Sequence, residues 1–164
     1  MILIILQIVA VLANIYIAST ENIKRVFIAT FIFNVFNLFC YLLLNDITTV
    51  VMYIFITIRS FVYIYRDKYK TKKFGSLVPI IFIVIQIILG LYFMQKYIQL
   101  LSICIPCYTC YYMWFNKTTQ ELRIGNIIAN SAWFIYNIVT GLYLVAAVRL
   151  VTIAANSIQY SKHI

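Results

Sequence analysis

The stretch Tyr65-Arg66-Asp67-Lys68-Tyr69-Lys70-Thr71-Lys72-Lys73 is the one long hydrophilic run in a sequence of 164 residues that is otherwise apolar almost throughout. It holds five of the 13 Lys and Arg residues and lies between two apolar segments. In membrane proteins, positive charge next to a span is retained on the cytoplasmic side. We therefore expect this run, called here the basic loop, to be cytoplasmic and to divide the chain into two blocks of helices.

Composition assigns the chain to the membrane. Hydrophobic residues make up 65% of it and charged residues 10%, whereas soluble domains have about 45–50% and about 25%. A formal charge of +9 would suggest a nucleic-acid partner in a soluble protein. Here the basic residues lie between apolar runs, so we expect contact with anionic lipid headgroups and no nucleic acid. The predicted fold class is all-α, a polytopic membrane protein.

Seven apolar runs approach the roughly 20 residues that a membrane span needs. Short polar breaks separate them, and the weakest break is Thr140-Gly141. A single helix over 122–161 would be about 60 Å long, twice the thickness of a bilayer core, so the chain must turn there. The predicted spans are 1–19, 25–44, 47–65, 77–94, 97–115, 122–141 and 142–161.

Charge asymmetry predicts the orientation of these spans. Ten basic residues lie on one side of the predicted membrane, whereas Lys96 alone lies on the other. This bias places the N-terminus outside and the C-terminus in the cytoplasm, which requires an odd number of spans and agrees with seven. The ten residues are Lys24, Arg25, Arg66, Lys68, Lys70, Lys72, Lys73, Lys117, Arg123 and Lys162.

The order of the spans predicts an internal repeat. Span 77–94 is apolar on every side except at Gln86, which suits a connector facing lipid, and three spans lie on either side of it. The two triplets match at an offset of about 97–100 residues, with Asn37 against Asn137 and Arg59 against Asn156. With an odd connector the repeats are parallel, related by an axis along the membrane normal. The predicted division is 1–66, 67–96 and 97–164: first repeat, basic loop with connector, and second repeat.

The segment Leu122-Arg123…Ala132-Trp133-Phe134-Ile135-Tyr136-Asn137…Gly141…Ala155-Asn156 resembles the YgjV-type bacterial inner-membrane proteins, and Ile58-Arg59-Ser60 fits the same pattern. The resemblance runs over nearly the whole chain. That family is similar in turn to the SWEET- and PnuC-type small transporters, which implies three-plus-one-plus-three spans, a bacterial inner membrane and solute passage. SWEET-type repeats usually carry a proline in the first helix of each triplet. Pro106 supplies it here only in the second triplet, so a symmetric gating hinge is not implied.

Span 122–141 carries a polar stripe whose members are three or four residues apart and so share one helix face. Carboxamides facing lipid would cost several kcal/mol each, so the stripe must face protein or water. In one interpretation Asn130 and Asn137 hydrogen-bond a solute while Trp133 offers an aromatic surface. In the other, the Asn side chains bond between helices, worth about 0.6 kcal/mol each. The stripe is Arg123, Asn126, Asn130, Trp133, Asn137 and Thr140.

Two arginines fall within spans, Arg59 and Arg149, and no Asp or Glu lies at their depth. An intramembrane arginine usually marks a function or a partner. Each could extend to the membrane surface, contact backbone carbonyls, or meet an anionic or hydroxylated solute. We expect Asn37, Arg59, Asn137 and Asn156 to converge on one central space and to bind a neutral polyhydroxylated or amide-bearing solute.

Other chemistry finds little support. Cys104, Cys107 and Cys110 have the spacing of an iron–sulfur run, but the fourth ligand is missing and the segment is a membrane helix. His163 is at a terminus, and no nucleophile–base pair or carboxylate pair is present. We therefore expect no enzyme, no metal and no cofactor.

The leading hypothesis is a small-solute transporter or facilitator, passive because the spans lack carboxylates. The alternative is a non-transporting membrane subunit or sensor that binds a protein partner. Self-association stays open. The candidate substrate-binding residues are Asn37, Arg59, Asn130, Trp133, Asn137, Arg149 and Asn156.

Overall fold

The chain is all-helical. The structure, a computed structural model, describes residues 2–70, 75–116 and 118–162, and eight helices lie within them. Seven of these match the predicted spans to within a few residues. Lys72, Lys73, Lys117 and His163 lie outside the described residues. The helices are α1 (Ile2–Ser19), α2 (Ile23–Leu43), α3 (Ile47–Ile64), α4 (Arg66–Lys70), α5 (Leu77–Phe93), α6 (Gln99–Phe115), α7 (Thr119–Val139) and α8 (Tyr143–Ser161).

Helix α4 lies within the basic loop and was not predicted from the sequence. Its first residue, Arg66, is 4% exposed and turns inward. Its Nη1 donates to the carbonyls of Met113 at 2.7 Å and Asn116 at 2.9 Å, at the end of α6, while its guanidinium lies 5.0 Å from the Phe27 ring. The last carbonyls of a helix have no partner within the helix, so a cation is stabilised there. The first cation of the basic loop, Arg66, is therefore part of the packing between α4 and the end of α6.

Local signals at the breaks set the helix ends. Asn22, Asp46 and Thr118 each accept a hydrogen bond from the backbone N–H three residues on, and Glu121 completes a capping box with Thr118. At the opposite ends, the turns before α3 and α8 each contain a residue in the left-handed region, Asn45 (φ 55°) and Gly141 (φ 78°). The chain thus turns at Thr140-Gly141, as predicted.

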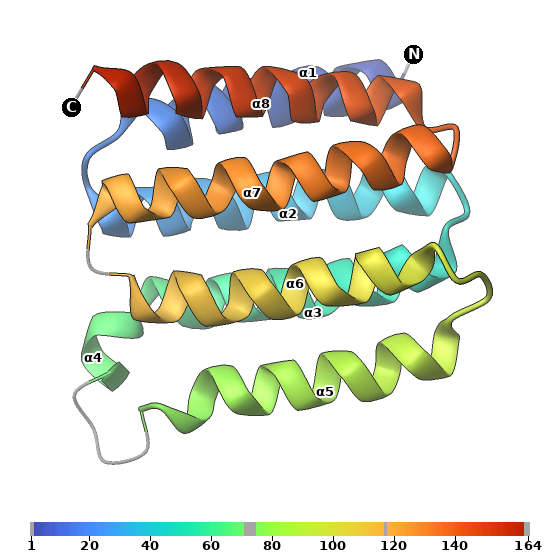
Figure 1. The fold of residues 1–164 in the computed structure, drawn as a ribbon, viewed down its shortest axis with the longest axis horizontal. Coiled ribbons are helices and arrows are strands. Elements are labelled where there is room, and N and C mark those ends of the chain that lie inside the picture. The colour runs from blue at the N-terminus through green and yellow to red at the C-terminus, as the bar shows by residue number, and fades with distance from the viewer. Residues whose placement is uncertain (1, 71–74, 117, 163–164) are drawn as a thin grey trace.

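In Figure 1 the long helices run alternately in opposite directions, and all of them except α5 form two rows. One row is α1, α2 and α3, and the other is α8, α7 and α6; α1 contacts α8 and α3 contacts α6. Helix α5 lies along the edge formed by α3 and α6 and contacts both. The start of α1 and the end of α8 lie at opposite ends of the bundle (Figure 1). The interior between the two rows is therefore framed by six helices.

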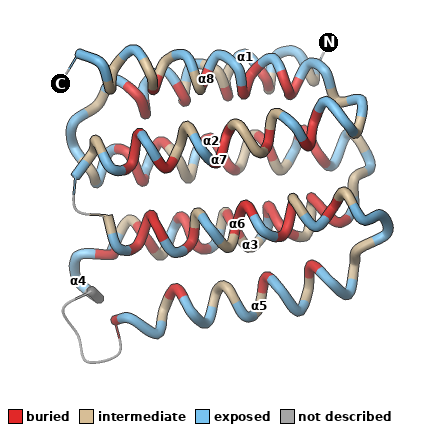
Figure 2. Tube along the Cα trace, viewed as in Figure 1, coloured by how far each residue is buried: buried red, intermediate tan, exposed pale blue. Residues whose placement is uncertain are grey.

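Burial follows the same plan, since the buried positions face inward and the outer faces are exposed and apolar (Figure 2). Two clusters form the core. One contains Tyr63, Trp114 and Phe27, and the other contains Tyr41, Tyr53 and Trp133. Buried polar side chains lie among these clusters, and an apolar exterior with the polar groups turned inward is the arrangement expected in lipid.

When the helices of the structure are judged by length and hydropathy alone, fewer of them qualify as membrane spans than were predicted from the sequence. Among the described residues, α1, α2 and α3 are long and apolar enough to cross a membrane, and α5 is apolar but has 17 residues. Helix α6 also has 17 residues. Helices α7 and α8 are longer, but their polar residues, among them the stripe of α7, lower their mean hydropathy.

Helix α5 was expected to be a connector that faces lipid. Its buried residues are Pro79, Gln86 and Gly90, so one face packs and the rest is open. Gly90 is the point of closest approach, because a Cβ there would lie 2.5 Å from Ile103 of α6. Gln86 is fully buried, so the one polar residue of the connector points into protein.

Candidate functional site

Arg149 of α8 is the most enclosed charge among the described residues, with 1% of its surface exposed. Its Nη2 donates to Tyr53 Oη at 2.7 Å and to Asn37 Oδ1 at 3.1 Å. Its Nη1 donates to Asn130 Oδ1 at 3.3 Å. Three helices other than its own, α2, α3 and α7, thus supply one neutral acceptor each. A guanidinium with five N–H groups is suited to such a convergence.

The carboxamides are held with their oxygens toward Arg149. Asn37 Nδ2 donates to the carbonyl of Phe33, and Asn130 Nδ2 donates to that of Asn126, both at 2.8 Å and both one turn back along the helix. Each nitrogen is thereby satisfied within its own helix. The oxygen is left to face the cation, which explains why a carboxamide, with a donor and an acceptor, is needed at both positions.

Aromatic faces complete the surroundings of this guanidinium. It lies 5.0 Å from the Phe33 ring and 5.6 Å from the Trp133 ring. Trp133 also lies against Tyr53 and Tyr41, with ring centroids at 5.5 and 6.2 Å. A cation over an aromatic face is stabilised by the ring quadrupole, more so when it is desolvated. Trp133 therefore belongs to the wall around Arg149, and its role as an aromatic surface for a solute stays a prediction.

Arg59 of α3 is 2% exposed and has a different partner. Its Nη1 donates to the carbonyl of Pro106 at 2.7 Å, and its guanidinium lies 5.7 Å from the Tyr63 ring. Thr109 Oγ1 donates to the same carbonyl at 3.0 Å. The sequence left three alternatives open for Arg59. In the structure it contacts a backbone carbonyl and does not extend to the surface.

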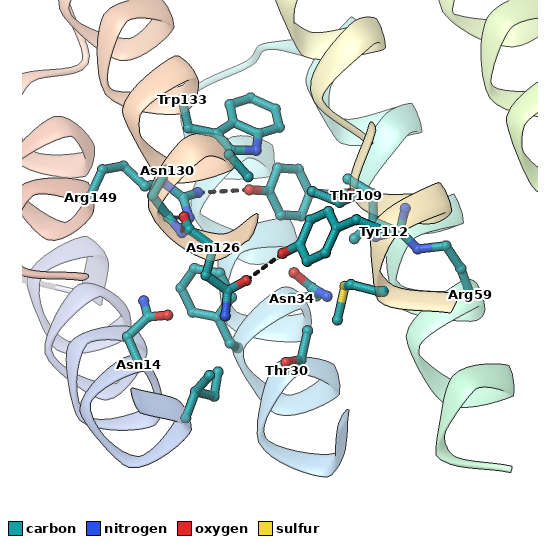
Figure 3. A pocket seen from close by; sticks show the side chains of 16 residues that line it. Asn14, Thr30, Asn34, Arg59, Thr109, Tyr112, Asn126, Asn130, Trp133 and Arg149 are labelled. Atoms are coloured by element: carbon teal, nitrogen blue, oxygen red, sulfur yellow. Dashed lines mark hydrogen bonds between the residues drawn. The ribbon is translucent and has the colours of Figure 1, made fainter. Parts of the chain in front are cut away.

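A cavity of about 60 Å³ lies between the two arginines. Its wall takes residues from both core clusters, for instance Phe33 and Trp133. In Figure 3 Arg149 and Arg59 enter from opposite sides of the view, and the carboxamides lie between them. This volume is well above the minimum that holds one water molecule. The polar residues in the wall are Asn14, Thr30, Asn34, Tyr53, Arg59, Thr109, Tyr112, Asn126, Asn130 and Arg149.

Several polar atoms of this wall are already paired with each other. Tyr112 Oη donates to Asn126 Oδ1 at 2.6 Å (Figure 3), and Asn34 Nδ2 donates to Ser60 Oγ at 2.8 Å. Other buried atoms of the wall have no partner among the described residues, namely Asn14 Nδ2, Arg59 Nε and Arg149 Nε. All three are N–H donors.

Carboxylates lie elsewhere. The four acidic residues of the sequence are Glu21, Asp46, Asp67 and Glu121, and each is next to or within the first turn of a helix. Asp46 Oδ2 accepts from Tyr136 Oη at 2.7 Å, and the exposed Asp67 lies 3.4 Å from Arg66. Neither Arg59 nor Arg149 has a carboxylate partner within the described part of the chain, so neutral groups alone solvate both buried charges.

The predicted site residues divide into two groups. Arg59, Asn130, Trp133 and Arg149 line the cavity, and Asn37 is bonded to Arg149. The other two predicted residues, Asn137 and Asn156, are fully buried but are not part of the wall.

The expectation that Asn137 and Asn156 share one space with the others is corrected by their depth. Asn137 is two residues from the end of α7, and Asn156 is 13 residues into the antiparallel α8. They therefore differ by about 16 Å along the bundle. Asn137 Oδ1 accepts from Tyr41 Oη at 2.9 Å, and Asn156 Nδ2 donates to the Thr152 carbonyl at 2.8 Å.

Sequence reasoning overlooked Tyr53, Asn34 and Asn14 as wall residues. A signal for α2 was present, because Thr30, Asn34, Asn37 and Tyr41 repeat the four-three-four spacing of the stripe in α7. Tyr53 gave no such signal, since a tyrosine in an apolar helix is ordinary.

The cysteine run in α6 does not gather at one point. Cys104 is exposed and Cys110 is buried, and Cys110 Sγ lies within 3.1 Å of Tyr63 Oη. No group of three possible metal ligands was found among the described residues.

The model of the family Imp-YgjV, bacterial inner membrane protein, matches residues 1–164 of the chain. The chain therefore belongs to this family, and it is an integral protein of the bacterial inner membrane that crosses it more than once. No curated protein and no solved structure matches it. The similarity to SWEET- and PnuC-type transporters stays a prediction.

Proposed function

Since the chain is an inner membrane protein of the Imp-YgjV family, we propose that it is a facilitator for a small polar solute, which occupies the cavity between Arg59 and Arg149. The observation that carries the proposal is this cavity, polar and lined by two buried cations inside an apolar exterior. Transporter sites usually lie at mid-membrane between helices. Buried charge inside a membrane protein is expensive and most often serves passage or binding.

The proposal includes seven spans, α1–α3 and α5–α8. These helices have 17 to 21 residues, about 25–32 Å at 1.5 Å per residue, close to the thickness of a bilayer core. The low hydropathy of α7 and α8 does not oppose this, because their polar residues face inward. Their outward faces carry Ile128, Ile135, Leu150 and Ile158, all exposed.

The proposal also includes two parallel repeats, 1–66 and 97–164. The buried positions of α2 and α7 coincide when the chain is shifted by 96 residues, from Val26 and Leu122 to Tyr41 and Asn137. The N-caps Asn22 and Thr118 and the left-handed residues Asn45 and Gly141 obey the same shift. In this register Asn37 corresponds to Trp133, and Asn137 to Tyr41, so the pairing of Asn37 with Asn137 expected from sequence is replaced.

This register supports a two-fold axis through the cavity. Tyr53 and Arg149 are equivalent positions of α3 and α8 and are bonded to each other. Tyr41 and Asn137 are equivalent positions of α2 and α7 and are also bonded to each other. Contacts between equivalent residues are expected close to a symmetry axis.

We propose that the N-terminus is outside and the C-terminus in the cytoplasm. The described cations other than the two in the cavity lie at one end of the bundle, at the starts of α2 and α7, in α4 and at Lys162, with the exception of Lys96. Such an excess is retained in the cytoplasm. The lack of a carboxylate at the cavity supports passive passage over coupling to protons.

A non-transporting subunit or sensor is the second candidate. The small volume of the cavity and the bonds within its wall, such as Tyr112 to Asn126, favour it. In this function the arginines would fix the helix arrangement, and a partner would be recognised on the outer surface.

Uptake into liposomes separates the two candidates. Osmotic swelling of vesicles containing the purified protein is followed with urea, glycerol, formate and acetate. Asn130→Leu removes one acceptor of Arg149 from the wall and is expected to slow passage about tenfold, the equivalent of one hydrogen bond to a charged group. Ser131→Leu is the control, since Ser131 Oγ bonds only within its own helix at Ile127. No passage of any solute, or equal slowing in both variants, would contradict transport through this cavity.

A further inference from the structure

We propose that the occupant of the cavity is a small carboxylate anion, of the size of formate or acetate, held between Arg59 and Arg149. The inference rests on the proposed function, in which this cavity is the solute pocket, and it specifies the chemical class of the solute. It also replaces the neutral hydroxylated solute expected from sequence.

Three buried atoms of the lining residues have no partner among the described residues. They are Asn14 Nδ2, Arg59 Nε and Arg149 Nε, and all three are donors. The oxygens nearest Arg149 are already engaged, since Asn37 and Asn130 accept from the guanidinium. A hydroxylated solute brings donors that need acceptors, whereas a carboxylate only accepts. An acceptor-only ligand therefore suits these three donors.

Charge leads to the same class of ligand. Two guanidiniums, each at least 98% buried, line one cavity, and both are paired with neutral groups only within the described part of the chain. Neutral oxygens and π faces reduce the cost of burying a cation but do not neutralise it. An anion would compensate both charges, and a planar carboxylate matches the planar fork of a guanidinium.

The volume is compatible with a small anion. The cavity of about 60 Å³ is well above the minimum that holds one water molecule. A carboxylate of one or two carbons is among the smallest of its class, whereas gluconate is a much bulkier carboxylate. The donors come from α1, α3 and α8, so the ligand would contact both rows of helices at once.

Thermal unfolding of the full-length protein in detergent tests the inference. Sodium formate, chloride and gluconate are compared at equal ionic strength. Formate is expected to raise the unfolding midpoint progressively with the logarithm of its concentration, because a ligand that binds only the folded state stabilises it by mass action. Chloride is expected to have a smaller effect, and gluconate none beyond its ionic strength.

Variants test whether the rise of the unfolding midpoint with formate depends on the cavity. Arg59→Gln is expected to weaken the apparent affinity for formate at least tenfold, and Asn14→Leu, which keeps both charges, several-fold. Arg25→Gln, which removes a cation outside the cavity wall, is the matched control and keeps the full response. If Arg59→Gln does not fold, Asn14→Leu still decides. An equal rise with formate and gluconate, or an undiminished response in Asn14→Leu, would overturn the inference.

The same protein in liposomes distinguishes the two proposals. Formate binding without passage of any solute would retain the carboxylate site and reject the transport function. Passage of urea or glycerol without any response to formate would retain transport and reject the carboxylate site.

Discussion

The substitution Tyr53→Phe removes one hydroxyl from the surroundings of Arg149 and leaves the ring in place. Tyr53 Oη accepts from Arg149 Nη2 at 2.7 Å, the shortest hydrogen bond of this guanidinium. The ring keeps its stacking on Tyr41, with centroids 5.0 Å apart. Because no cavity larger than a hydroxyl is created, the change measures the hydrogen bond to the buried cation with little else.

The expected cost is about 1.5 kcal/mol of unfolding free energy. In soluble proteins a hydrogen bond to a charged group is worth about 1.5–3 kcal/mol. In membrane bundles hydrogen bonds average about 0.6 kcal/mol with a maximum near 1.7. A buried cation that loses an acceptor should lie near that upper limit.

Tyr41→Phe is the matched comparison. Tyr41 Oη donates to Asn137 Oδ1 at 2.9 Å in the same cluster, and its electrostatic interaction with Arg149 ranks below that of Tyr53, so its loss is expected to cost less, about 0.6 kcal/mol. Tyr143→Phe, at a residue that is 68% exposed, should be silent. Unfolding by SDS in mixed micelles can be followed through the fluorescence of the buried Trp114 and Trp133.

The order of the three costs is what the reasoning predicts. If Tyr41→Phe cost as much as Tyr53→Phe, the direct hydrogen bond between Arg149 and Tyr53 would add nothing to stability. If Tyr53→Phe were silent, Arg149 would be solvated by something other than these side chains, and the description of the site would be refuted.

The remaining predictions concern packing and orientation. Gly125→Val is expected to destabilise the protein by about 1–3 kcal/mol, because a Cβ at Gly125 would meet the ring of Tyr112; unfolding by SDS measures it, Ser131→Ala is the control, and a variant as stable as the wild type would contradict the close packing. In a cysteine-free background, an impermeant thiol reagent added to intact cells should label Lys96→Cys and leave Lys68→Cys unlabelled, and the reverse pattern would contradict the proposed orientation.

The positions of the helices could be predicted from the sequence because lipid imposes a simple rule. A span must be about 20 apolar residues long and must satisfy its own backbone, so polar residues such as Asn45-Asp46 and Thr140-Gly141 mark the turns. The short helix α4 was missed because the side chain of Arg66 bonds to carbonyls of α6, far along the chain. Such a partner leaves no local signal in the sequence.

The inward face of each helix could also be predicted from the sequence, but the depth of each residue in the bundle and its hydrogen-bond partner could not. Asn130, Trp133 and Arg149 were correctly expected on inward faces, because carboxamides and guanidiniums are costly in lipid. The repeat was expected from a few residue identities at about 97–100 positions, whereas the caps and buried faces coincide at 96. A shift of four residues is about one helical turn, so the expected register kept the correct face but placed Asn137 opposite Asn37 in place of Trp133.

The sequence by itself determined that this chain is a bundle of apolar helices with polar inward stripes and an excess of cations at one end, since composition, periodicity and charge are properties of the chain alone. Only the tertiary structure decided that Arg149 is bonded to Asn37, Tyr53 and Asn130 while Arg59 takes the carbonyl of Pro106, and that the two cations face one cavity. The reason is physical. A buried charge is stabilised by whichever acceptors the packing of helices brings within about 3 Å, and that packing depends on contacts between residues as far apart in the chain as Asn37 and Arg149.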